Sequence, residues 1–210
     1  MEQEVNSELR EYMQEKIFPI YNKNEKGHGI EHIQKVIKRS LKFAKEQKVN
    51  LDMAYTIAGF HDIGHHIDRK KHEQIPAEIF MKDENMKRFF TEEQRKTIKE
   101  AIEDHRASSV HEPRSIYGKI VSTADRTIDD IECTIKRAYS YEKNSYKEKS
   151  HQEIKEGIYK HLKEKYGLGG YSKVYLKDKE YEESLKMLRK AIENKETFMK
   201  MIDDVMLKQD

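Results

Sequence analysis

The chain has 210 residues, of which 36% are hydrophobic and 38% charged, with a formal net charge of +2. Disorder normally adds a large net charge of one sign, whereas these charges are mixed and carried by Lys, Glu and Arg, which favour helices. Because basic and acidic residues alternate, nothing indicates nucleic-acid binding, and the single cysteine excludes an internal disulfide. With no secretory signal and no apolar stretch near the ~18 residues of a membrane helix, we expect a cytoplasmic protein without a membrane partner.

The sequence predicts an all-α fold. Only three prolines and nine glycines interrupt the chain, apolar residues recur at helical spacing, and no segment predicts a strand. Pro19 is expected to stop the opening helix, and Thr91 to Gln94 form a predicted capping box. His28 and His32, four residues apart, are expected to share one helix face. In chain order, the predicted helices cover residues 1–18, 29–47, 51–62, 72–81, 91–105, 116–139, 145–166 and 178–207.

Two of these segments have distinct expected positions. Residues 51–62 are apolar nearly all round, so this helix is expected at the centre of the fold, with Gly64 ending it. Residues 106–114, which include Pro113, are expected to form a loop.

Six candidate metal ligands lie at or near the ends of different predicted helices, which is how a helical bundle assembles a metal site in its core. Imidazole and carboxylate donors suit iron, manganese, zinc or nickel, and no thiolate takes part. The adjacent pair His61-Asp62, flanked by apolar residues, needs a partner if it is buried. A carboxylate at Asp62 is suited to bridge two ions about 3.5–4 Å apart. The six candidates are His32, His61, Asp62, His72, His105 and Asp125.

The order and local context of these residues resemble the HD-domain superfamily of metal-dependent phosphohydrolases. The resemblance covers about residues 27–140 and rests on three runs in this sequence: Gly27 to His32, His61 to Gly64, and Ala124 to Arg126. It implies that His32, His61, Asp62 and Asp125 bind a first metal ion. It also implies that His72 and His105 bind a second, as in the binuclear branch, with Asp62 as the bridge.

The sequence departs from the family pattern at several points. Many members carry lysine directly after the glycine of the His-Asp motif, where a cation meets the substrate phosphate, and here that residue is His65. The basic residues Arg69, Lys70 and Lys71 are alternatives for this role. The Gly-Tyr-Pro signature of cyclic-di-GMP phosphodiesterases and the acidic pair of alarmone hydrolases are both missing, which disfavours these two substrates.

Individual residues keep alternative interpretations. His28 is expected either to orient substrate, to act as a general acid, or simply to start a helix. Arg126 is expected to stabilise transition-state charge or to pair with Asp129 or Asp130. His72 is alternatively a surface histidine in a charged run, and His105 a histidine interacting with a helix dipole. Arg106 and Arg114 are further phosphate candidates.

Together these features predict an N-terminal helix and linker (1–26), an HD metal-binding core (27–140) and a C-terminal helical extension packed on it (141–210). The implied activity is hydrolysis of a phosphate ester or anhydride of a small molecule, a nucleotide first, by metal-activated water, with Asp62, His28 and Arg126 as catalytic candidates. Two divalent transition metal ions are expected per chain, iron or manganese first, with zinc, nickel, cobalt or magnesium as alternatives. The rival functions are a di-iron oxygenase and a non-catalytic nucleotide-binding module, and a homodimer is a further expectation.

Overall fold

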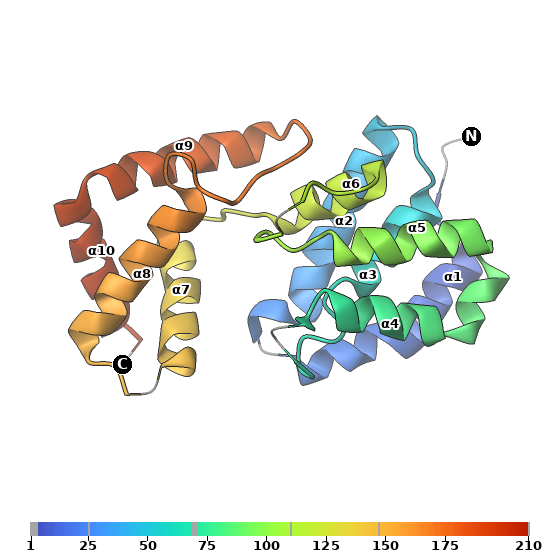
Figure 1. The fold of residues 1–210 in the computed structure, drawn as a ribbon, viewed down its shortest axis with the longest axis horizontal. Coiled ribbons are helices and arrows are strands. Elements are labelled where there is room, and N and C mark those ends of the chain that lie inside the picture. Colours follow the sequence, from blue (N-terminus) through green and yellow to red (C-terminus); the bar gives the residue numbers. More distant parts are fainter. Residues whose placement is uncertain (1–3, 25, 69–70, 110, 147, 210) are drawn as a thin grey trace. The chain divides into compact units, whose positions relative to one another are not determined.

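The structure is a computed structural model that describes residues 4–24, 26–68, 71–109, 111–146 and 148–209. Over these residues the protein is helical and contains no strand, which confirms the all-α prediction. The chain divides into two compact units, Met1–Asp125 with Val174–Leu176, and Arg126–Lys173 with Lys177–Asp210 (Figure 1). The division at residues 26 and 140 that the sequence predicts stays a prediction.

The first unit starts with a helical run that changes type twice. An α-helix, a π-helical turn and a 3₁₀-helix follow one another, so Pro19 does not end the helical run as predicted. Pro19 lies in the first turn of the 3₁₀-helix, where its missing N–H costs no hydrogen bond. The segments are α1 (Ser7–Tyr12), η1 (Met13–Ile17), η2 (Phe18–Lys23) and η3 (Lys26–His28).

The centre of the first unit is α3 (Leu51–Phe60), in which every residue except Asp52 is buried. It packs against α2 (Ile30–Glu46), α5 (Glu92–Glu103) and α6 (Ile116–Asp125), as its all-round apolar character predicts. The helix ends at Phe60, earlier than the predicted end at Asp62, so the His-Asp pair lies in the turn that follows.

The other elements of the first unit close this core. The predicted capping box at Thr91 is present and starts α5, which packs against α4 (Gln74–Lys82). A short 3₁₀-helix, η5 (Glu84–Arg88), joins these two helices. Residues Val174–Leu176 return to this unit, where the backbone N–H of Tyr175 donates to Thr123 Oγ1 at 3.0 Å and Leu176 packs on the core.

The described residues of the second unit form four helices: α7 (Ile131–Ser145), α8 (His151–Tyr166), α9 (Lys179–Glu193) and α10 (Lys195–Leu207). The prediction of one helix over residues 116–139 is wrong, because the chain leaves the helix after Asp125. Asp130 then caps α7 by accepting a hydrogen bond from the Cys133 backbone N–H. The predicted helix over 178–207 is likewise two helices, since Asn194 caps α10.

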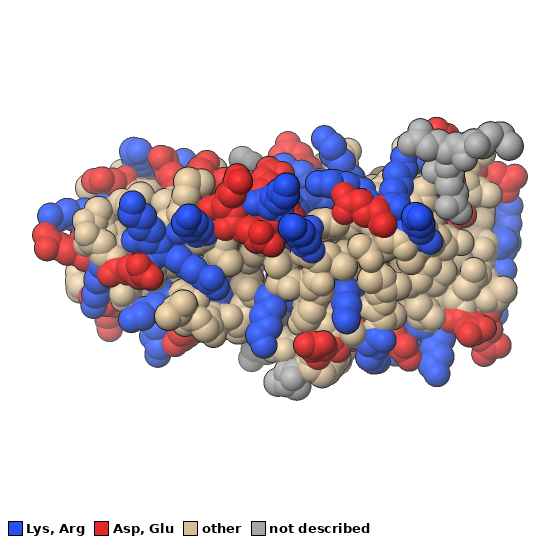
Figure 2. All heavy atoms as spheres, turned by 90° about the horizontal axis from the view of Figure 1, so that it is seen from above, with Lys and Arg blue, Asp and Glu red and all other residues tan. Residues whose placement is uncertain are grey.

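Charges of both signs cover the surface, as the composition predicts. On the face drawn in Figure 2, Lys and Arg side chains are interspersed with Asp and Glu side chains. Among the described residues, no helix is both long and apolar enough to span a membrane.

Candidate metal centre

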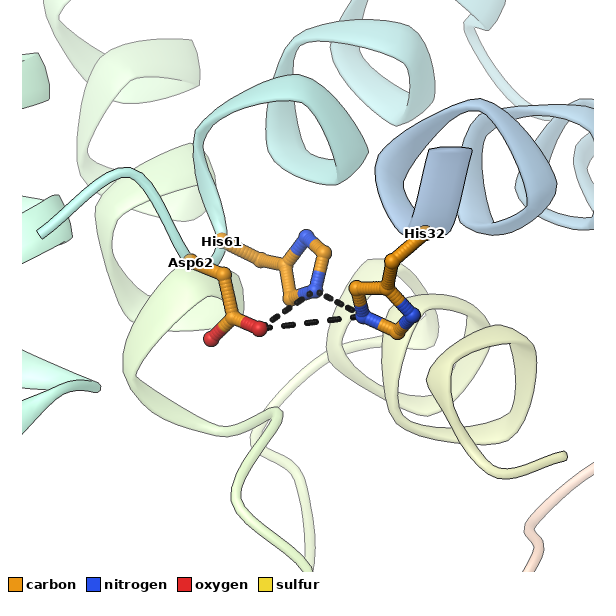
Figure 3. Close-up of side chains that lie close together, drawn as sticks. All are labelled: His32, His61 and Asp62. Carbon is orange, nitrogen blue, oxygen red and sulfur yellow. Dashed lines mark hydrogen bonds and ion pairs between the residues drawn. The ribbon is translucent and has the colours of Figure 1, made fainter. Parts of the chain in front are cut away.

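Four of the predicted ligands converge in the first unit. His32 lies in the first turn of α2, His61 and Asp62 directly follow α3, and Asp125 is the last residue of α6. His32 Nε2 lies 3.3 Å from His61 Nε2 and 3.1 Å from Asp125 Oδ1. Asp62 Oδ2 lies 3.4 Å from His61 Nε2 and 3.7 Å from His32 Nε2. The side chains of His32, His61 and Asp62 point toward one another in Figure 3. Together with Asp125, we call these residues the first donor group.

A second group of donors lies beside Oδ1, the other carboxylate oxygen of Asp62. His105, two residues beyond the end of α5, has its Nε2 atom 3.5 Å from Asp62 Oδ1. His72, two residues before α4, offers a ring nitrogen within 4.8 Å of the Asp62 and His105 donor atoms. Asp62, His72 and His105 therefore form this second group, and Asp62 belongs to both.

The donor geometry fits divalent transition metal ions. Two donors about 2.1 Å from one ion at tetrahedral or octahedral angles lie roughly 3.0–3.4 Å apart. The first group has donor separations of 3.1–3.7 Å, close to this range. Asp62 turns Oδ2 toward the first group and Oδ1 toward the second.

Local backbone contacts orient the two buried histidines in the same way. The Nδ1 atom of His61 lies 2.8 Å from the carbonyl oxygen of Ala58, and that of His105 lies 2.6 Å from the carbonyl oxygen of Ile102. A carbonyl only accepts, so each Nδ1 carries the proton and each Nε2 is left as a metal donor. In both cases a histidine just past a helix end bonds back three residues along the chain.

Two side chains from the N-terminal region hold the His-Asp turn. The buried Tyr21 hydroxyl donates to the Gly59 carbonyl at 3.0 Å and accepts from the Asp62 N–H at 3.2 Å. The Asn24 amide donates to the carbonyl oxygens of Asp62 and His28, at 2.9 and 3.0 Å. Residues before the first metal-binding helix therefore fix the backbone that presents Asp62.

A partly buried arginine fixes the end of α6. Arg39, on α2, donates from Nε to the Ala124 carbonyl at 2.9 Å and from Nη2 to the Thr123 carbonyl at 3.1 Å. The cation satisfies carbonyls at the negative end of the helix dipole, next to Asp125. Arg39 thereby couples the helix that carries His32 to the helix that carries Asp125.

The HD domain family model matches residues 29–129 of the chain. Residues 29–129 are an HD domain. A comparison with curated proteins found no match, and neither did a comparison with solved structures. The HD domain marks a superfamily of metal-dependent hydrolases, and its members are generally phosphohydrolases. The histidine and aspartate clusters of this HD domain are suited to divalent metal ions.

The buried charges of the HD domain stabilise one another. Burial opposes ionisation, but the adjacent carboxylates of Asp62 and Asp125 hold the pKa of His61 well above its ordinary value. Burial likewise opposes the charged forms of Asp62 and Asp125, yet neighbouring histidines hold the pKa of each carboxyl well below its ordinary value. Without a metal ion, a protonated His61 therefore balances the charge of the neighbouring carboxylates.

Six histidines of the HD domain and its N-terminal flank form a closed circle of neighbouring side chains beside Asp62. Neighbouring ring centroids are 3.8–5.9 Å apart, and the shortest separation belongs to the stacked pair His28 and His65. His28 lies in η3, before α2, so the prediction that it shares a helix face with His32 is wrong. Burial lowers the pKa of His28 to about 4, so it is neutral at pH 7. In order, the circle is His28, His32, His61, His105, His72 and His65.

The predicted cationic residues have diverse surroundings. Arg126 is buried and begins the second unit, and its catalytic role stays a prediction. Arg114 donates to Asp104 and Glu103, and Arg106 to Glu73, so both are engaged in ion pairs. Lys71 is exposed, and the two other phosphate candidates, Arg69 and Lys70, lie outside the described residues.

Sequence reasoning missed Tyr21, Asn24, Arg39 and Glu73, which contact the donor groups or the backbone beside them. Asn24 lies in the expected polar linker, and Tyr21 lies just before that linker, after the predicted end of the opening helix. Arg39 is one of many cations on an amphipathic helix. Only the position of Glu73, directly after a candidate ligand, gave a signal in the sequence.

Proposed function

We propose that this HD domain holds two divalent transition metal ions and hydrolyses a phosphate ester or anhydride of a small molecule. The observation that carries the proposal is the Asp62 carboxylate, whose Oδ2 faces His32 and His61 while its Oδ1 faces His105. A phosphorylated small molecule, with nucleotides as the first class to test, is the proposed substrate. Iron and manganese are the first ions to test, because the donors are imidazoles and carboxylates.

In this proposal, His32, His61, Asp62 and Asp125 hold one ion, and Asp62, His72 and His105 hold the other. Such ions act as Lewis acids toward phosphoryl oxygens and lower the pKa of bound water. The chain's own contribution is to position: the Nδ1 bonds of His61 and His105 fix which nitrogen faces inward. Tyr21 and Asn24 keep the Asp62 backbone in place through three hydrogen bonds to the His-Asp turn.

His28 and His65 are proposed to contact the substrate. Their rings stack at 3.8 Å beside both donor groups without belonging to either. Since the pKa of His28 lies at about 4, this imidazole is neutral at pH 7. It is therefore suited to orient substrate by hydrogen bonding, rather than to act as a general acid.

The first experiment measures metal content and hydrolysis together. Anaerobically purified protein and its His72→Ala variant are analysed for metals, reconstituted with Mn²⁺ or Fe²⁺, and assayed with nucleotides and other phosphate esters. We expect two ions per chain in the parent protein, one in the variant, and release of inorganic phosphate or a shorter nucleotide only from the parent.

Other results would favour the rival functions. Oxygen uptake without phosphate release, by protein loaded with iron, would replace the hydrolase with a di-iron oxygenase. Tight nucleotide binding without turnover or metal would favour a binding module. One ion in both proteins would support a mononuclear hydrolase and remove His72 from the ligand set.

A further inference from the structure

An ion pair joins the neighbours of the two histidines in the second donor group. Arg106, directly after His105, places its Nη1 atom 3.0 Å from both carboxylate oxygens of Glu73, directly after His72. The two residues are distant in sequence and belong to the segments before α4 and after α5. The pair therefore ties together the two chain segments that carry the histidines.

The same carboxylate also contacts a ring nitrogen of the histidine beside it. Glu73 Oε2 lies 3.5 Å from His72 Nδ1. A carboxylate beside one imidazole nitrogen directs the other nitrogen toward a metal ion and raises its basicity. Glu73 is thus placed between Arg106 and His72, where it can act on the orientation of the histidine ring.

Partial burial makes this ion pair different from the exposed pairs of the chain. The side chains of Glu73 and Arg106 are 17% and 35% exposed, whereas those of Glu78, on the adjacent helix, and its partner Lys82 are 64% and 79% exposed. Solvent screens a pair such as Glu78 and Lys82 strongly, so its geometry is worth little. The Arg106 guanidinium is further oriented by Ser108, whose hydroxyl oxygen lies 3.0 Å from Nε.

Local backbone structure orients three of the other candidate ligands. His61 and His105 are fixed by backbone carbonyls within their own turns, and Asp125 ends a regular helix. His72 lies in a turn before α4 and retains 20% side-chain exposure. The Glu73 carboxylate beside its ring is itself held by Arg106.

We propose that Glu73 and Arg106 are positioning residues that set the affinity of the second metal ion, by holding the His72 ring and the His105 segment in register. The inference rests on the proposed two-ion function and adds the residues that control the occupancy of its second ion. Neither residue is proposed to touch substrate.

The test is a Mn²⁺ titration of the metal-free full chain, read by electron paramagnetic resonance of free and bound Mn²⁺ and by calorimetry. In Glu73→Gln and in Arg106→Gln, we expect the second Kd to rise by about 10- to 100-fold, as for other residues that orient metal ligands. The first Kd is expected to stay within about 2-fold, and the double variant to be no worse than the more affected single variant.

Matched controls separate this effect from a general loss of charge. Glu78→Gln removes an exposed carboxylate from α4, and Arg88→Gln breaks an exposed ion pair with Glu8. Both are expected to keep the two Kd values of the parent protein. Circular dichroism and thermal melts of the metal-free variants check that each one is folded.

Three results would overturn the inference. If the parent protein binds two ions and the Glu73 and Arg106 variants bind them equally tightly, the pair has no positioning role and the proposed function stands. If both ions weaken to the same extent, the pair supports the fold rather than the second site. If the parent protein itself binds one ion, the two-ion function and this inference fail together.

Discussion

The two donor groups share Asp62 but are built by different means. The first group takes its donors from the ends of α2, α3 and α6, three helices that pack against one another in the core. The second takes His105 from the end of α5 and His72 from a turn, and a partly exposed ion pair joins their neighbours. Core packing positions one group, whereas side-chain electrostatics must help to position the other. We therefore expect the second group to bind metal more weakly and to respond more strongly to changes in surrounding residues.

Removing the shared ligand should erase the difference between the groups. In Asp62→Ala, neither group keeps a full donor set, so we expect loss of both ions and a fall in hydrolysis on the order of 10³-fold or more. Elemental analysis and a phosphate-release assay measure the two effects. The matched control is Asp204→Ala, which changes an exposed aspartate of α10. Retention of either ion by the Asp62 variant would contradict the bridging role.

Removing a histidine that belongs to one donor group alone should affect the metal ion of that group alone. His61→Ala is expected to abolish the first ion and His105→Ala the second, because each Nε2 faces a different oxygen of Asp62. Titration with Mn²⁺ counts the remaining ion in each case. The exposed His151 provides the control substitution, and the comparison fails if both variants lose the same ion.

The first ion should be strongly sensitive to pH. Because the pKa of His61 is held well above its ordinary value, a metal ion must displace a proton, and affinity should rise by up to tenfold per pH unit until that raised pKa is passed. Calorimetry in buffers of different ionisation enthalpy counts the released protons. Affinity that does not change with pH between about 6 and 8, where histidines ordinarily titrate, would contradict the protonation of His61 in the metal-free protein.

The free energy of unfolding of the metal-free protein should also depend on pH, and it should fall at both high and low pH. A raised pKa of His61 contributes stability that is complete below the ordinary histidine pKa and is lost as pH rises through the raised value. The lowered pKa values of Asp62 and Asp125 contribute stability that is lost as pH falls through them. Denaturant titrations of metal-free protein at acid, neutral and alkaline pH should therefore show an unfolding free energy that is highest at intermediate pH and falls on both sides.

Loosening α6 should weaken the first ion alone. Arg39→Gln removes the cation that bonds the Thr123 and Ala124 carbonyls beside Asp125, and we expect about a tenfold rise in the first Kd. Lys42→Gln, on the same helix and near Phe43, is the control. An effect confined to the second ion would show that α6 does not position the first group.

The smallest expected effect concerns the packing of α4 on the His-Asp turn. A Cβ atom at Gly64 would lie 2.4 Å from Ile75 Cγ2, so Gly64→Ala forces the start of α4 away. Overpacking of this kind costs about 1–3 kcal/mol of unfolding free energy. Thermal and denaturant melts measure it, with Gly27→Ala as control because nothing lies within 4 Å of a Cβ there.

The sequence by itself determined the fold class and most of the helices. Apolar spacing identified the central helix, and the Thr91 capping box marked the start of α5, since both signals are local and are written in neighbouring residues. The grouping of histidines and aspartates, with its resemblance to the HD superfamily, named the six candidate donors before any geometry was known.

Only the tertiary structure decided how those donors are arranged and supported. In the structure, the two oxygens of Asp62 face different donor groups. His28 precedes α2, and the helix predicted over residues 116–139 is interrupted after Asp125. The tertiary structure also brought Tyr21, Asn24, Arg39 and the Glu73–Arg106 pair to the site. These contacts join residues far apart in the chain, and periodicity and capping report only on neighbours, so no local pattern could predict them.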